Sequence, residues 1–123
     1  MPKQIIVNNI NRKMDSSPRI KYCDTFLTQL RGFAFRPRLM HDEGLILVGA
    51  RDSRIDSSIH MLFVSFNLTI IWINSDMQVV DKVHAKSWRL AYFSKQPAKY
   101  VLEIHSERWE DYEIGDSVEF KDV

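Results

Sequence analysis

The sequence is poor in the residues on which several common functional motifs depend. It has one cysteine, Cys23, among 123 residues, so no disulfide can form within the chain. Its four glycines lie far apart, at positions 32, 44, 49 and 115, which excludes a phosphate-binding loop or a dinucleotide fingerprint. Basic and acidic residues nearly balance, 17 against 16, so no strongly basic surface is available. We therefore expect no nucleic-acid partner.

The sequence also lacks a long hydrophobic run. The longest apolar stretch, Ile59–Ile73 (IHMLFVSFNLTIIWI), falls short of the roughly 20 apolar residues that a membrane-spanning helix needs. The first residues, MPKQIIVNNINRK, do not form a signal peptide. We therefore expect a cytoplasmic protein with no membrane partner. The length and the apolar content of 45% predict one domain, residues 1–123, with one hydrophobic core.

The stretch Ile59–Ile73 shows the clearest periodicity in the chain. Its even positions are almost all apolar, whereas Ser65, Asn67 and Thr69 share the other face. This alternation, with many β-branched and aromatic residues, predicts extended strands, because a helix would distribute the three polar residues around its surface. A usual strand has about five or six residues, so we expect a bend near Ser65–Asn67.

Shorter segments predict further strands, because each combines β-branched or aromatic residues with turn-forming flanks. They are Gln4–Ile10, Ile20–Cys23, Leu45–Val48, Gln78–Val83, Tyr100–His105 and Ser117–Phe120. Asn74-Ser75-Asp76 predicts the turn of a hairpin. Residues 84–99 lack periodicity and predict a long loop with aromatic anchors.

Helical signals are few. Asp24-Thr25 predicts the N-cap of a short helix over Thr25–Arg31, which Gly32 ends. A helical turn is expected within Ser106–Glu113. Short strands without alternating strand–helix units predict an all-β fold, mainly an antiparallel barrel or sandwich, with one short helix.

Patterns typical of catalytic and metal sites are missing. The four histidines, at positions 41, 60, 84 and 105, show no metal-ligand spacing, and Cys23 stands alone, so we expect no metal site and no cofactor. Neither Cys23 nor Ser65 has an adjacent base, and no Gly-x-Ser-x-Gly elbow occurs. The sequence therefore predicts no catalytic residue of these kinds.

Some polar groups are nevertheless placed where they suit a ligand. Arg36 follows a Phe-Ala-Phe triplet and precedes Pro37, a position from which a guanidinium can hold a carboxylate or phosphate in bidentate fashion. The alternative is an internal salt bridge to Asp42 or Glu103. His60 begins the apolar face of the longest stretch, where it either forms a hydrogen bond beside the core or contacts a ligand.

Six short segments carry a family resemblance. They are residues 31–36 (RGFAFR), 42–47 (DEGLIL), 58–66 (SIHMLFVSF), 87–89 (SWR), 100–104 (YVLEI) and 114–116 (IGD). In order and spacing they resemble the R-G-L-M-x-R, E-G-(L/M), S-I-H-M-x-F-M-x-F, P-W-R, Y-V-L-E-(L/V) and V-G-D motifs of the uncharacterised family DUF192, from Thr25 to Phe120. The resemblance implies a compact β-rich sandwich or barrel and no established activity.

One segment departs from the pattern of that family. After Phe66 the family usually reads Pro-x-Asp, whereas this chain reads Asn67-Leu68-Thr69. Thr69 therefore stands where the resemblance implies a carboxylate, and Asn67 stands in place of a proline that would fix the bend. If that carboxylate belongs to a site of the family, the resemblance implies that this chain has lost the charge there.

Three functional hypotheses follow. The first is a non-catalytic binding or interaction module for a small polar or anionic ligand, with Arg36, His60, Thr69, Trp88 and Arg89 lining a pocket beside the Ala85–Lys99 loop. The alternative is a hydrolase-like enzyme with an acid–base site around His60 and Glu103. The third is a protein-interaction domain, a monomer or weak homodimer through an edge strand or exposed aromatic residues such as Trp109 and Tyr112.

Overall fold

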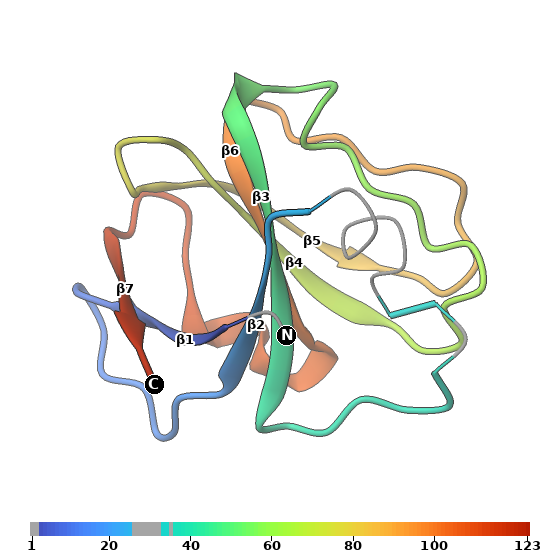
Figure 1. Cartoon of the computed structure of the whole chain (residues 1–123), viewed down its shortest axis with the longest axis horizontal. Coiled ribbons are helices and arrows are strands. Elements are labelled where there is room, and N and C mark those ends of the chain that lie inside the picture. Colours follow the sequence, from blue (N-terminus) through green and yellow to red (C-terminus); the bar gives the residue numbers. More distant parts are fainter. Residues whose placement is uncertain (1–2, 26–32, 35) are drawn as a thin grey trace.

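The computed structural model describes residues 3–25, 33–34 and 36–123 (Figure 1). In this part of the chain, seven strands and one 3-10 helix succeed one another. They are β1 (Gln4–Asn9), β2 (Arg19–Cys23), β3 (Glu43–Ser53), β4 (Leu68–Ile73), β5 (Val79–Ala85), β6 (Ala98–His105), the helix η1 (Ser106–Asp111) and β7 (Val118–Asp122). The expected all-β fold is confirmed, and η1 confirms the expected helical turn.

The seven strands form one sheet with the order β5-β4-β6-β3-β2-β1-β7. All neighbouring pairs are antiparallel except β2 and β3, which run parallel, and the sheet curls into a half-barrel (Figure 1). The predicted turn at Asn74–Asp76 joins β4 to β5 as expected. The predicted helix over Thr25–Arg31 lies outside the described residues, apart from Thr25 itself. None of the helical segments in the described ranges is long and apolar enough to cross a bilayer.

Each face of the sheet carries a hydrophobic core. On β4, Leu68, Ile70 and Trp72 belong to one core, whereas Ile71 and Ile73 belong to the other. Every residue of β4 is buried, because β5 and β6 pair with its two edges and side chains cover both faces. The second half of the longest apolar stretch is therefore a strand, as its period of two predicts.

The first half of that stretch, residues 59–67, forms no regular strand, which corrects the prediction. The chain turns at Phe63, which has a φ of 62°, and the amide of Val64 donates to the carbonyl of Met61 at 3.1 Å. A left-handed residue cannot continue an extended strand. Ile59 and Met61 are buried before this turn and Val64 after it, so the buried positions change from odd to even at the turn. The expected bend occurs at Phe66.

The central strand β3 approaches both of its neighbours closely at Gly44. A Cβ at this position would lie 2.7 Å from the carbonyl oxygen of Glu103 on β6 and 2.8 Å from Cδ1 of Ile20 on β2. The carbonyl belongs to a paired strand and cannot move aside as a side chain would. Only glycine therefore allows β2, β3 and β6 to pack at this spacing.

Glu103 places a carboxyl group inside the sheet region. The residue is 6% exposed, and its cross-strand neighbours are Leu45 on β3 and Ile70 on β4, which both belong to one hydrophobic core. Burial raises the pKa of Glu103 to about 8. The carboxyl is therefore mostly protonated at neutral pH.

We expect Gly44→Ala to lower the free energy of unfolding by about 1–3 kcal/mol, because the added methyl group must displace backbone. Urea unfolding measures this change. Gly49→Ala is the matched control: its Cβ would lie 3.0 Å from the carbonyl oxygen of Lys99, so the loss should be smaller. Wild-type stability in Gly44→Ala would contradict the close approach of the strands.

We expect Glu103→Gln to gain stability relative to the wild type as pH rises. In the unfolded chain this carboxyl ionises near its ordinary pKa of 4.5, whereas the folded protein keeps it protonated up to about pH 8. Below pH 4.5 the raised pKa of Glu103 does not change the free energy of unfolding of the wild type. Between pH 4.5 and about 8 it lowers that free energy by up to about 1.4 kcal/mol for each pH unit. Melting temperatures of both proteins across this range test the expectation, and a difference independent of pH would contradict it.

Candidate functional site

Two exposed aromatic residues border a groove near Arg36. Phe63 and Trp88 are 47% and 55% exposed, and their rings meet edge to face with centroids 5.3 Å apart. The groove has a volume of about 410 Å³ and is lined by these two residues together with Arg36, Pro37 and Ser65. It therefore combines an aromatic wall with one cation and one hydroxyl, a lining suited to a ligand with a ring and an anionic group.

The backbone conformation of this aromatic pair is unusual. Phe63 has a φ of 62° and Trp88 a φ of 66°, in the left-handed region that bulky residues rarely adopt. Each such residue costs about 1–2 kcal/mol relative to ordinary geometry. The buried residue Met61 holds both turns, since its carbonyl accepts from the amide of Trp88 and its amide donates to the carbonyl of Arg89, both at 2.9 Å. The fold thus keeps two bulky residues in a costly conformation at the surface.

The side chain of Arg36 is held by a carboxylate, and its backbone carbonyl is held by a serine hydroxyl. Its Nη2 donates to Oε1 of Glu43 at 2.8 Å, and its carbonyl accepts from the hydroxyl of Ser65 at 3.0 Å. Desolvation acts to raise the pKa of Glu43, but the hydrogen bonds from Met40 and Arg36 outweigh it, and the pKa lies below its ordinary value. The sequence offered Asp42 or Glu103 as salt-bridge partners, and the observed partner is the neighbouring Glu43.

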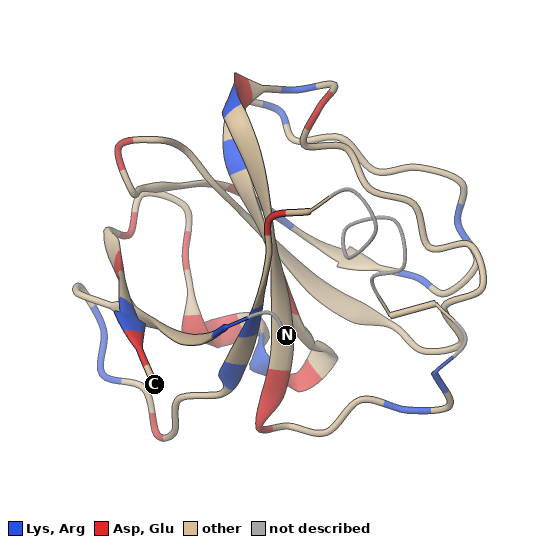
Figure 2. Ribbon diagram, in the orientation of Figure 1, with Lys and Arg blue, Asp and Glu red and all other residues tan. Residues whose placement is uncertain are grey.

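A second, polar cleft of about 450 Å³ shares Arg36 with the aromatic groove. Figure 2 shows the basic residues of β2 beside the acidic start of β3, so charges of both signs face this cleft. It is lined by Gln4, Arg19, Lys21, Phe33, Arg36, Asp42, Glu43 and Gly44. Arg36 therefore lies between a charged cleft and an aromatic groove.

The other residues predicted for the site lie elsewhere. His60 is exposed and lines a separate cavity of about 230 Å³ with Arg51 and Lys99. Thr69 is fully buried on β4, where its hydroxyl donates to the carbonyl of Ser106 at 3.1 Å. Of the five predicted residues, the structure brings Arg36 and Trp88 into one groove, while the side chain of Arg89 is exposed beside it.

The hydrolase hypothesis placed an acid–base site around His60 and Glu103, with either residue as the base. Among the described residues, Glu103 does not line the cavity that contains His60. Its carboxyl is buried beside Leu45 and Ile70 and is mostly protonated at neutral pH. A general base must be deprotonated and within hydrogen-bond reach of the substrate. The geometry therefore gives no support to a paired acid–base site at these residues.

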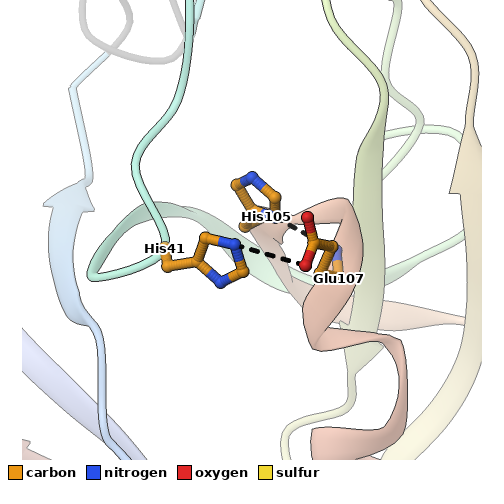
Figure 3. Close-up of side chains that lie close together, drawn as sticks. All are labelled: His41, His105 and Glu107. Carbon is orange, nitrogen blue, oxygen red and sulfur yellow. Dashed lines mark hydrogen bonds and ion pairs between the residues drawn. The ribbon is translucent and has the colours of Figure 1, made fainter.

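One cluster was missed by reasoning from the sequence. His41, His105 and Glu107 each offer one atom able to bind a metal, and these atoms lie within 4.8 Å of one another (Figure 3). Desolvation lowers the pKa of His105, and the nearby charges of His41 and Arg108 lower it further. Together these effects exceed that of Glu107, which acts to raise the pKa. Local spacing could not reveal this cluster, because its histidines are distant in sequence and meet only through strand pairing.

The comparisons with known proteins agree with the sequence motifs. The model of the DUF192 family, described as an uncharacterized ACR, matches residues 6–120. A UPF0127 protein of Thermococcus kodakarensis is 38% identical over 85 residues, covering 69% of this chain and 52% of the relative. A UPF0127 protein of Pyrococcus furiosus is 34% identical over 96 residues, covering 77% and 78%. The chain thus spans about half the length of the Thermococcus relative.

Two crystal structures share the fold. A protein of unknown function from Novosphingobium aromaticivorans aligns with a TM-score of 0.78 at 23% identity, covering 94% of this chain and 83% of the other. A putative transcription regulator from Sinorhizobium meliloti aligns with a TM-score of 0.81 at 15% identity, covering 98% and 94%. At these identities the likeness concerns the fold alone. The family model and the relatives above 30% identity show that the chain belongs to the DUF192 family.

Proposed function

We propose that this chain is a non-catalytic binding module that holds a small ligand carrying a carboxylate or phosphate together with an aromatic ring. The ligand would occupy the groove lined by Arg36, Phe63 and Trp88. The observation that carries this proposal is the exposed aromatic pair, held in left-handed backbone conformation beside a guanidinium. Costly backbone geometry of this kind gathers at ligand-binding and catalytic sites.

The chemistry of Arg36 supports the anionic part of the ligand. A guanidinium has five N–H donors, and Glu43 takes up one of them at 2.8 Å. The Arg36 side chain is 38% exposed, so its remaining donors are within reach of a ligand. A carboxylate or phosphate fits the planar fork of these donors, and Glu43 keeps the fork in place before the ligand arrives.

The lining of the groove favours binding over catalysis. Among its described residues, none carries an imidazole or a carboxylate that would act as a general base. The hydroxyl of Ser65 donates to the carbonyl of Arg36 and has no base beside it within this lining. The groups present can orient and hold a ligand, which is the work of a binding module.

We expect aromatic carboxylates or nucleoside monophosphates to raise the melting temperature of the wild-type protein and to quench its tryptophan fluorescence. Arg36→Gln should weaken this binding by about tenfold or more, because a charge-assisted pair is worth about 1.5–3 kcal/mol. Arg89→Gln is the matched control, since Arg89 is exposed nearby but does not line the groove. No shift with either ligand class, or equal binding by Arg36→Gln, would refute the proposal.

We expect Trp88→Gly to abolish the same binding while changing the free energy of unfolding by less than about 1 kcal/mol. Glycine adopts a φ of 66° without strain, and this gain offsets the lost contact with Phe63. Urea unfolding measures the change in stability. The ligand-induced shift in melting temperature, followed without tryptophan fluorescence, measures binding. A large loss of stability would instead assign Trp88 a structural role.

A further inference from the structure

The pairing of β3 with β6 brings three possible metal ligands to one end of the sheet. Gly44, near the start of β3, pairs with Ile104, near the end of β6, so the turn before β3 lies beside the start of η1. His41 lies in the turn before β3, His105 ends β6, and Glu107 lies in the first turn of η1 (Figure 3). The pairing of β3 with β6 thus brings together the segments that carry the three residues.

The side chains of this cluster face one another. The rings of His41 and His105 stack with centroids 3.9 Å apart and an interplanar angle of 22°. Nε2 of His41 lies 3.4 Å from Oε2 of Glu107, and Nδ1 of His105 accepts a hydrogen bond from the amide of Glu107 at 3.1 Å. Two imidazoles and one carboxylate therefore converge, with one ligand atom of each within 4.8 Å of the others.

We propose that His41, His105 and Glu107 form a binding site for a divalent transition-metal ion, with zinc as the reference ion. Two imidazole nitrogens and one carboxylate oxygen are a ligand set that zinc uses with a water in the fourth position. Magnesium and calcium prefer oxygen ligands throughout, so this set selects against them.

Rotation of two side chains would bring the cluster to metal geometry. Ligand atoms of a tetrahedral zinc ion lie about 3.3 Å apart when the bonds are about 2.0–2.1 Å long. The side chains of His41 and Glu107 are 57% and 70% exposed, so both can rotate without disturbing either hydrophobic core. His105 is partly buried at the end of β6 and serves as the fixed member of the set.

The backbone that carries the three ligands is already held in place. Nε of Arg108 donates to the carbonyl of His41 at 2.6 Å, which ties the turn before β3 to η1. The same guanidinium pairs with Asp111 at 2.9 Å and bonds to Ser16. The positive charge of Arg108 is thus offset by Asp111, which leaves the carboxylate of Glu107 for the metal.

Metal binding has a specific consequence for the start of η1. His105 caps this helix, because its Nδ1 accepts from the amide of Glu107. A neutral imidazole that accepts at Nδ1 carries its proton on Nε2. A metal on Nδ1 displaces the amide, and a metal on Nε2 leaves the proton on Nδ1, which then cannot accept. Either way, zinc binding releases the amide of Glu107 from its cap.

Isothermal titration calorimetry of the untagged full chain with zinc chloride tests this site. We expect one zinc ion per chain, and we expect His41→Ala and Glu107→Gln each to weaken binding by about tenfold or more. His60→Ala and His84→Ala are the controls, because both histidines are exposed outside the cluster. Equal affinity in the two cluster variants and the wild type, or no saturable binding, would overturn the proposal.

Amide spectra of ¹⁵N-labelled protein provide a second readout that adventitious surface binding would not move. On addition of zinc, the amide resonance of Glu107 should shift in the wild type and stay in place in His41→Ala. His41 is an exposed turn residue, so this variant should keep the wild-type amide spectrum elsewhere. An unmoved Glu107 resonance in zinc-saturated wild-type protein would contradict coordination by His105.

Discussion

The pairing of β3 with β6 is the interaction on which most of this structure depends. It requires the close approach at Gly44, where the backbone of β6 occupies the space of a side chain. The same register sets the start of β3, and Glu43 at that start holds Arg36 at the aromatic groove. It also brings His41 beside the end of β6. A central strand pair thus helps to position both candidate sites, whose residues lie outside the strands apart from His105 at the end of β6.

Local features of the sequence predict local parts of the fold well. The alternation in Leu68–Ile73 and the turn residues Asn74–Asp76 produce β4 and its hairpin, because side-chain period and turn chemistry act over a few residues. For residues 59–67 the same side-chain period predicted a strand that does not form. Their apolar residues alternate in sequence, but the left-handed turn at Phe63 shifts burial from Ile59 and Met61 to Val64, and no pattern of apolar residues reports a φ value. The parallel pairing of β2 with β3 is equally invisible to local pattern.

The candidate site was predictable only in part, because its residues come from segments that are distant in sequence. Arg36 and Trp88 stood out in the sequence and share a groove, whereas Thr69 is satisfied inside the sheet by the carbonyl of Ser106. The family motif ending in Asp116 likewise has a structural explanation. Its carboxylate accepts hydrogen bonds from Arg12, Asn9 and the amide of Glu113, which joins the end of β1 to the turn before β7. Motif membership alone therefore does not separate binding residues from structural ones.

The backbone energetics of the aromatic pair bear on the choice between these two roles. A folded domain is stable by about 5–15 kcal/mol, so two left-handed bulky residues at about 1–2 kcal/mol each use a noticeable part of that margin. Glycine would form both turns without this cost. Phe63 and Trp88 leave about half of their surface exposed, so burial returns only part of what the backbone loses. What the two rings add beyond glycine is accessible aromatic surface beside Arg36, which is the surface that the proposed ligand would use.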